Sequence, residues 1–204
     1  MRALSDYRPP YSLGQLALQT GLANAGLFRV VDLLQRESLV EKQSRRGPIV
    51  AVDWVGVLER WCQDYSLMGS NPVLLALEPR GTDALLSKLR TADRGYVLTA
   101  SAVASRIAPV APSRLITIFT ESPEAAATEL GVTPTDTGAN VLLVEPFSPA
   151  LMQRTEMRDG LRCAALSQVV ADLLTSPGRG PAEAEALIFW MRENEDAWRR
   201  MIST

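Results

Sequence analysis

Arginine side chains near the N-terminus form the pattern with the clearest chemical use in this sequence. Arg29 and Arg36 fall on one face of a predicted helix, and Arg45 and Arg46 are adjacent in a polar turn. A guanidinium group donates two parallel hydrogen bonds to phosphate oxygens or to the edge of a guanine base. Arginines at these positions indicate contact with the backbone and the base edges of DNA.

Charged side chains in the second half offer weaker possibilities. Asp172 and Glu145 could act as paired acids for a metal ion, but the sequence supplies no third ligand for them. Arg179 stands between two glycines before a predicted helix, where backbone N–H groups could hold a phosphate oxygen. A turn between two helices is the simpler interpretation. Glu183 and Glu185 suit the first turn of that helix, because its dipole favours acids.

The composition argues against catalysis. The chain contains no histidine, which removes the commonest general base and every Ser-His or Cys-His arrangement. Cys62 and Cys163 match no metal or redox spacing and are predicted to be buried free thiols. No glycine-rich phosphate loop of standard spacing is present in the sequence. We therefore expect no enzyme activity, no cofactor and no metal.

The charge balance is close to neutral, with 21 Lys and Arg against 23 Asp and Glu. Residues 1–66 carry eight basic and seven acidic side chains, a net charge of +1, which leaves −3 for the remainder. DNA binding must therefore depend on a few clustered arginines. No apolar run approaches the ~20 residues of a membrane span, and the N-terminus lacks the apolar core of a signal peptide, which predicts a cytoplasmic protein.

Two consecutive helices are predicted to position the first two arginines. The first begins at the capping hydroxyl of Ser12 and ends at Gly21, which can adopt the left-handed conformation of a helix exit. The second covers about Asn24–Glu37, and its opposite face is polar and begins with small residues, as in a helix that enters the major groove. Its apolar stripe is Leu27, Val30, Val31 and Leu34, and its polar face is Ala25, Arg29, Asp32 and Arg36, flanked by Asn24 and Phe28.

A two-stranded ribbon with a basic tip follows the second helix. Its predicted strands are Leu39–Lys42 and Ile49–Val52, and the connection Gln43–Pro48 ends in Gly-Pro. Helix, turn, helix and ribbon together resemble a winged helix-turn-helix. The likeness rests on Leu16, Ala17, Gly21, Val30, Leu34, Leu39 and Val40. The alternative is that any small helical hairpin also needs a core stripe and a turn glycine.

The predicted DNA contacts divide between bases and phosphates. Asn24 and Arg29 are expected to approach base edges, and Arg36, Arg45 and Arg46 to bind phosphate oxygens. The complete predicted contact set is Asn24, Ala25, Phe28, Arg29, Asp32, Arg36, Ser44, Arg45 and Arg46. The expected partner is double-stranded DNA with a repeated site, bound by two copies of the chain.

Residues 1–10 are too short to supply the helix that normally precedes such a helix pair. The core around Leu16 therefore needs another cover, for which a predicted helix over Asp53–Ser66 is the candidate. The stripe of that helix is Trp54, Val57, Leu58, Trp61 and Tyr65, which we assign to the joint between the two halves. The expected domains are residues 1–68 and 69–204, joined at Gly69-Ser70-Asn71-Pro72.

Beyond residue 72 strands alternate with helices, which predicts a mixed α/β domain closed by two helices. The predicted strands are Val73–Leu77, Gly95–Leu98, Arg114–Phe119, Ala139–Glu145 and Leu161–Ala165. The predicted helices are Thr82–Leu89, Thr99–Ile107, one between Ser122 and Gly131, a turn near Leu151–Arg154, Ser167–Leu174, and Pro181 to about Ile202. The predicted fold class is α/β (α+β), with an N-terminal winged helix-turn-helix.

Several motifs of the second half resemble one family. They are Tyr96-Val97-Leu98-Thr99, the strand Arg114–Phe119, Asn140–Leu143, Asp159-Gly160-Leu161, and the closing stretches Ser167–Leu174 and Pro177–Leu187. Together with the helix pair and ribbon in front, they are similar to the AbiEi family of antitoxins from abortive-infection type IV toxin–antitoxin systems. The resemblance extends from Tyr11 to Met191, and it departs from the family where the helix before Tyr11 is missing.

This resemblance implies a transcriptional autorepressor. In that family the N-terminal domain binds inverted repeats in its own promoter, and the C-terminal domain counters a nucleotidyltransferase-like toxin without forming a stable complex. The candidates for antitoxin function in this chain are Gln168, Asp172, Arg179 and Glu183. The alternatives are a stand-alone regulator, a nucleotide-binding or enzymatic α/β domain whose winged helix contacts protein, and a module used only for dimerisation.

Overall fold

The computed structural model describes residues 1–92 and 95–202, and the fold is mixed α/β. The chain divides into two compact units. Unit 1 comprises Met1–Asp64 together with the C-terminal segment that begins at Met191, and unit 2 comprises Tyr65–Trp190. The first boundary lies within a few residues of the predicted one. The prediction that everything after residue 69 forms one domain is wrong, because the chain's last segment folds into unit 1.

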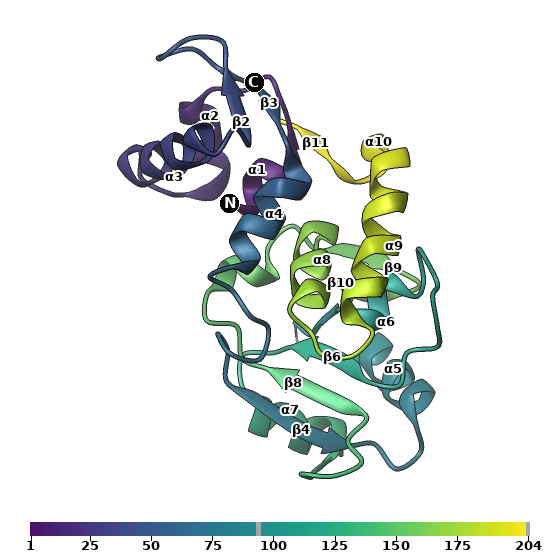
Figure 1. Cartoon of the computed structure of the whole chain (residues 1–204). Helices are drawn as coiled ribbons and strands as arrows, with labels where there is room; N and C mark the ends of the chain where they lie inside the picture. The colour runs from purple at the N-terminus through teal and green to yellow at the C-terminus, as the bar shows by residue number, and fades with distance from the viewer. Residues whose placement is uncertain (93–94, 203–204) are drawn as a thin grey trace. The chain divides into compact units, whose positions relative to one another are not determined.

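The helices of unit 1 that precede residue 65 are α1 (Arg2–Asp6), α2 (Leu13–Thr20), α3 (Asn24–Arg36) and α4 (Trp54–Cys62) (Figure 1). A capping box starts α2: the Gln15 N–H donates to the Ser12 hydroxyl at 3.1 Å, and the Ser12 N–H donates to the Gln15 side chain at 2.8 Å. Gly21 ends α2 with a φ of 67°. The two helices predicted between Ser12 and Glu37 are therefore confirmed.

The ribbon after α3 is an antiparallel hairpin of β2 (Val40–Lys42) and β3 (Ile49–Val52). Val40 and Ile49 are buried, whereas the connection between the strands is largely exposed. Figure 1 shows this connection as a loop that extends beyond the helices of unit 1. The predicted strand pair is confirmed, with Val40 opposite Val52 and a shift in register between Glu41 and Lys42.

The end of the chain differs most from the prediction. The prediction of one long closing helix that reaches Ile202 is wrong, since α9 ends at Glu193 and other elements follow it. The last elements are α9 (Gly180–Glu193), α10 (Glu195–Trp198) and the strand β11 (Arg200–Met201), and β11 pairs in parallel with β1 (Tyr7–Arg8). Backbone hydrogen bonding to β1 and side-chain packing in unit 1 thus override the helical pattern of this segment.

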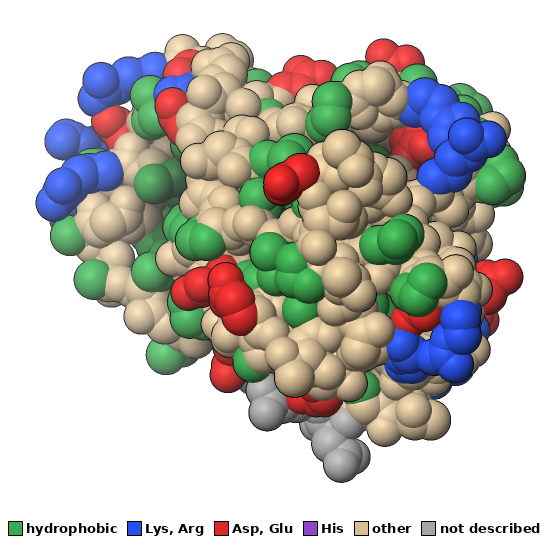
Figure 2. Space-filling view, turned by 90° about the horizontal axis from the view of Figure 1, so that it is seen from below, with side chains coloured by type: hydrophobic (Ala, Val, Ile, Leu, Met, Phe, Trp, Pro, Cys, Tyr) green, Lys and Arg blue, Asp and Glu red, His purple; other side chains and the backbone are tan. Residues whose placement is uncertain are grey.

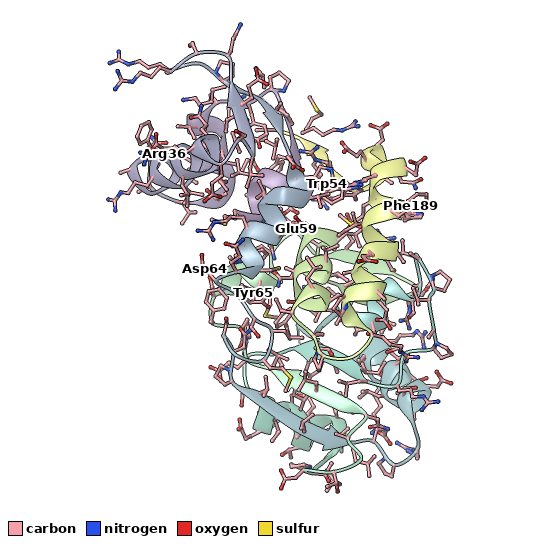
Figure 3. The ribbon with its side chains drawn as sticks, viewed as in Figure 1. Arg36, Trp54, Glu59, Asp64, Tyr65 and Phe189 are labelled. Atoms are coloured by element: carbon pink, nitrogen blue, oxygen red, sulfur yellow. The ribbon has the colours of Figure 1, made fainter. Side chains whose placement is uncertain are left out.

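Buried contacts fix the C-terminal segment in unit 1. The Arg199 guanidinium donates to the backbone oxygens of Ser5 at 3.0 Å and Tyr7 at 2.8 Å. The ring of Trp198 packs edge-on against Trp54, with centroids 4.9 Å apart. Trp54 stands at the start of α4 (Figure 3). The segment therefore replaces backbone partners and apolar cover that the short N-terminal region does not provide by itself.

The core of unit 1 draws on nearly all of its elements. Buried members come from α1, β1, α2, α3, the hairpin and α4: Leu4, Tyr7, Tyr11, Leu16, Leu27, Val31, Leu34, Val40, Ile49 and Val57. Ile202 packs against the same cluster. The expectation that the helix after the ribbon covers this core is confirmed by Val57, although the helix is shorter than predicted and ends at Cys62. Tyr65 lies beyond it and belongs to unit 2.

Unit 2 is built on a mixed sheet, which among the described residues has the strand order β7-β4-β8-β6-β5-β10-β9. These strands are β4 (Val73–Leu77), β5 (Val97–Thr99), β6 (Ile116–Phe119), β7 (Thr133–Pro134), β8 (Val141–Val144), β9 (Glu156–Arg158) and β10 (Leu161–Cys163). The neighbours β6 and β8 are parallel, with Ile116 opposite Val141. The five predicted strands are present, while β7 and β9 are short edge strands that the sequence did not reveal.

Helices pack on both faces of this sheet. They are α5 (Thr82–Thr91), α6 (Ser101–Ala104), α7 (Pro123–Leu130) and α8 (Leu166–Leu174), with a 3-10 turn at Pro149–Met152. Figure 1 shows α7 behind β4 and β8, and α8 on the other side of the sheet. The alanine-rich helix predicted over Thr99–Ile107 is too long, because Thr99 belongs to β5 and Ala100 has a φ of 51°, which interrupts the helix.

Two predictions made from composition can be compared with the structure. Cys163 is buried as predicted, but Cys62 is only partly buried, and neither is part of a disulfide bond among the described residues. None of the helices in residues 1–92 and 95–202 combines the length and the apolar content needed to cross a membrane.

A buried carboxylate ties α5 to the sheet of unit 2. The Glu78 side chain is 1% exposed, and its carboxylate accepts a hydrogen bond from Lys88 Nζ. The same Lys88 Nζ also donates to the backbone oxygen of Leu130. The backbone N–H of Arg80 donates to the same carboxylate at 3.2 Å. The Lys88 ammonium group is the main cause that lowers the pKa of Glu78 below its ordinary value of 4.5, against an opposing effect of burial.

Acidification should therefore destabilise unit 2 through Glu78. Because its pKa is lowered on folding, its contribution is complete above pH 4.5 and is lost as the pH falls through the lowered value. The substitution Lys88→Met should cost about 2 kcal/mol at pH 7 and flatten the acid dependence. Urea unfolding between pH 7 and pH 3 measures both effects. Parallel pH profiles for the two proteins would show that Lys88 is not the cause.

Candidate functional site

The exposed face of α3 is the first candidate site. Leu27, Val31 and Leu34 are buried beneath the helix, as the predicted stripe requires. On the other side Asn24, Ala25, Phe28, Arg29 and Arg36 are exposed and Asp32 is partly exposed. Phe28 is 50% exposed, an unusual position for a large aromatic side chain. The structure therefore brings the predicted helical contact residues together on one uncovered surface.

Arg36 has a partner on its own helix. Its guanidinium group pairs with the carboxylate of Asp32, one turn earlier on α3 (Figure 3). Both side chains remain accessible, and such exposed pairs spaced four residues apart contribute only about 0.3 to 0.5 kcal/mol. A phosphate group can therefore displace Asp32 from Arg36 at small cost, while Asp32 neutralises part of the positive charge in its absence.

The tip of the hairpin is the second part of this surface. Ser44, Arg45 and Arg46 are exposed there, and Lys42 Nζ donates to the backbone oxygen of Arg45 at 2.8 Å. A Cβ atom at Gly47 would stand 2.7 Å from the Ser44 hydroxyl and 3.0 Å from the Ser44 backbone nitrogen, so this turn leaves little room for a side chain. A tight turn thus holds two guanidinium groups beyond the strands.

Basic side chains are scattered on one face of this protein. On the face drawn in Figure 2, Lys and Arg side chains stand in separate groups, with uncharged and acidic side chains between them. This distribution agrees with a formal net charge of −2. Any binding of an anionic polymer must therefore come from individual placed arginines and not from a general attraction.

A buried carboxylate at the centre of unit 2 contains two of the predicted antitoxin residues. Asp172 is fully buried and accepts hydrogen bonds from the Tyr65 hydroxyl at 2.6 Å, from Gln168 Nε2 at 2.7 Å and from the Thr99 hydroxyl. Burial is the main cause that raises the pKa of Tyr65, and the charge of Asp172 adds to it. Tyr65 thus remains a neutral donor at any ordinary pH, and the cluster is a structural network closed to ligands.

The other two predicted antitoxin residues line a cavity of about 200 Å³ at the start of α9. Arg179 is exposed there beside Arg114, whereas Glu183 is buried and accepts a hydrogen bond from the Ser101 hydroxyl. A Cβ atom on Gly180 would stand 2.5 Å from the Leu173 oxygen, so this position requires glycine. The predicted four-residue set therefore divides into a buried pair and a pair at a cavity.

The structure does not support the paired-acid alternative. Asp172 is enclosed by its donors, while Glu145 lines a different cavity, of about 440 Å³, with Glu121 and Arg162. Residues 1–92 and 95–202 contain no group of three or more potential metal ligands.

Some residues of these sites were not foreseen from the sequence. Tyr65 and Thr99 are partners of Asp172, and Ser101 is the partner of Glu183. The spacing of four residues between Gln168 and Asp172 was a visible signal for a pair on one helix face. Their remaining partners lie 73 and 107 residues away in the chain, where no local pattern connects them.

Comparison with known proteins does not add to these observations. No protein-family model matches the chain, and neither a curated protein nor a solved structure matches it.

Proposed function

We propose that this chain is a DNA-binding transcriptional repressor and that unit 1 is its winged helix-turn-helix. The observation that carries the proposal is the uncovered polar face of α3, which begins at Asn24 and stands over a buried apolar stripe. An α-helix presented in this way fits the major groove of B-DNA. The hairpin tip with Arg45 and Arg46 supplies two further cations at a second position.

The side chains divide into two kinds of contact under this proposal. Asn24 and Arg29, in the first two turns of α3, read base edges, because the N-terminal part of such a helix enters the groove. Arg36, Arg45 and Arg46 bind phosphates. A unit with so little net charge gains affinity when two copies bind a repeated site, so inverted repeats bound by two chains are the proposed operator.

We further propose that the repressor is the antitoxin of a type IV toxin–antitoxin system in the cytoplasm. The support is the resemblance of the motifs in unit 2 to the AbiEi family. In this role unit 2 counters a nucleotidyltransferase-like toxin without forming a stable complex with it. The candidate surface through which unit 2 acts lies around Arg179 and Glu183. Co-expression with a toxin gene encoded beside it tests this: growth should be rescued by unit 2 even when α3 carries Arg29→Ala.

DNA binding itself is tested by fluorescence anisotropy with the duplex that lies upstream of the coding sequence and with a shuffled duplex of equal length. The proposal expects tighter binding to the upstream duplex by at least about tenfold, since specific sites usually exceed random DNA by far more. Equal and weak binding to both duplexes at low salt would contradict the proposed function of unit 1.

Replacing both wing arginines should weaken binding to every duplex. For Arg45→Ala with Arg46→Ala, the slope of log Kd against log salt should fall by about two, because two phosphate contacts are lost. The matched control is Arg114→Ala with Arg179→Ala, which removes the same charge from unit 2 and should leave the slope unchanged. An unchanged slope in the wing variant would show that the hairpin does not touch DNA.

In the same assay Arg29→Ala should reduce the preference for the upstream duplex, whereas equal losses on both duplexes would contradict its role in base reading.

A further inference from the structure

We infer that unit 1 contains a binding site for a small hydrocarbon-like ligand, in a cavity bounded by α1, α2 and α3, and that this ligand regulates DNA binding. The cavity has a volume of about 280 Å³. Leu4 from α1, Leu16 from α2, and Leu27 and Val31 from α3 form its walls. The existence of the site follows from the structure of unit 1 alone, whereas its regulatory effect rests on the proposed function.

The described elements of unit 1 leave this space unfilled. α1 has only five residues, and it presents Ala3 beside Leu4 toward the helix pair. Leu16, Leu27 and Val31 are nevertheless almost completely shielded from water, at 1%, 7% and 2% exposure. The core is therefore closed enough to exclude solvent around these side chains but is not packed to the density usual for protein interiors.

The chemistry of the walls defines the class of ligand. Among the described residues that line the cavity, Thr20 has the only polar side chain, and its hydroxyl already donates to the Leu16 oxygen at 2.8 Å. A polar ligand would lose its hydrogen bonds to water and find none here. Since a dry apolar cavity of roughly 150 Å³ holds benzene, this one suits an apolar group of about two fused rings or a comparable alkyl chain.

Gly26 gives an independent indication that the space is meant to be filled. It is the third residue of α3, and glycine has a lower helix propensity than alanine. A Cβ atom built there meets no other atom within 4 Å, so nothing in the folded chain requires glycine at this wall of the cavity. Glycine is typical of positions where a ligand approaches the backbone closely.

The dimensions favour a small molecule over a second protein chain. A stable protein interface involves about 20 to 30 residues on each side, and the cavity has far fewer lining residues. Its opening is bordered by Leu22, which is 58% exposed. A polar head group attached to the hydrocarbon part can remain in water at this opening. The occupant is therefore an apolar or amphipathic small molecule, and not a docked helix.

The position of the cavity connects it to the proposed reading surface. Leu27 is a direct neighbour of Phe28 in α3, and it lies three residues after Asn24 at the start of the helix. A ligand that contacts both α2 and α3 stabilises the arrangement of the helix pair that the described structure shows. It should therefore raise the affinity for DNA, and DNA should raise the affinity for the ligand by the same factor.

Naphthalene is a suitable probe, with sorbitol as a polar molecule of similar size. Methyl NMR spectra of the full chain should show saturable shifts of Leu16, Leu27 and Val31 with naphthalene and none with sorbitol. Ala3→Phe fills the cavity from α1 and should weaken naphthalene binding more than tenfold. If Ala3→Phe does not fold, Ala3→Leu, which adds less volume, is measured in its place. Ala182→Phe, at an exposed position of α9, is the matched control and should bind normally.

The outcomes separate the site from the function. Naphthalene binding to the free protein together with at least threefold tighter binding to the upstream duplex supports the whole inference. Binding without any effect on DNA affinity overturns the regulatory part, and binding without any DNA affinity at all overturns the proposed function but keeps the site. Absence of methyl shifts, equal binding by Ala3→Phe, or a dimer in sedimentation that Ala3→Phe abolishes would each overturn the ligand site.

Discussion

Trp198→Ala should unfold unit 1 while leaving unit 2 folded, at a cost of about 3 to 5 kcal/mol. Trp198 is 6% exposed, packs edge-on against Trp54, and donates its indole N–H to the Met191 oxygen at 2.9 Å. The neighbouring Arg199 donates hydrogen bonds to two backbone oxygens of the N-terminal segment. Removing the ring leaves a cavity at the point where both ends of the described chain meet. Since whole domains are stable by only about 5 to 15 kcal/mol, one such loss is enough to unfold a small unit.

The measurement must observe the two units separately. Urea unfolding followed by methyl NMR should show the Leu16 and Leu34 signals of unit 1 lost at lower urea than in the wild type, while signals from the sheet of unit 2 keep their midpoint. DNA binding should disappear as well, although Trp198 is not among the proposed contact residues. Phe189→Ala is the control, because Phe189 is 70% exposed on α9 (Figure 3) and its loss should change little. A common shift of both units would contradict independent unfolding.

Asp172→Ala should destabilise unit 2 by about 3 to 5 kcal/mol. The substitution leaves the hydroxyl of Tyr65, the amide of Gln168 and the hydroxyl of Thr99 without the acceptor that they share. A buried donor that loses its acceptor costs about 1 to 3 kcal/mol, and the remaining hydrogen bond from Gln168 Nε2 to the Tyr65 hydroxyl, at 3.2 Å, recovers part of the sum. Tyr65→Phe removes one donor and leaves the carboxylate with the others, so it should cost less.

A double-mutant cycle with Asp172→Ala and Tyr65→Phe distinguishes this network from a general effect of volume. Once Asp172 is absent, Tyr65→Phe should cost less than it does in the wild type, because the hydroxyl has already lost the carboxylate that accepts its hydrogen bond. Urea unfolding of the four proteins gives the coupling free energy. Additive effects would show that Tyr65 and Asp172 do not share a hydrogen bond that matters. The proposed rescue of growth by unit 2 should persist in Tyr65→Phe, since the cluster is closed to ligands.

Local signals in the sequence were sufficient to predict much of unit 1. Ser12 with Gln15 marks a helix start, Gly21 marks its end, and the stripe of Leu27, Val31 and Leu34 sets the buried face of α3. Each signal acts within one or two turns of the chain, so no knowledge of the fold is required. The exposed positions of Arg29, Arg45 and Arg46 follow directly from these elements.

Features that depend on distant partners could not be predicted. The segment after Asn194 has helical composition, but β1 and Trp54 hold it in another conformation. Thr99 was predicted to begin a helix, whereas its pairing with Thr117 keeps it in β5. Asp172 suggested a metal ligand because an isolated acid in a sequence has no visible partner. In each case the deciding contact joins residues separated by at least 18 positions, and a single sequence contains no record of it.

The parallel pairing of Tyr7 with Arg200 has a consequence for biosynthesis. Unit 2 can fold as soon as its last residues have left the ribosome, because all of its elements are contiguous in the chain. Unit 1 begins earlier in the sequence but must wait for the C-terminal segment to emerge, so the order of folding is the reverse of the order of synthesis. A chain that ends before Trp198 would therefore contain the α/β unit without an assembled unit 1.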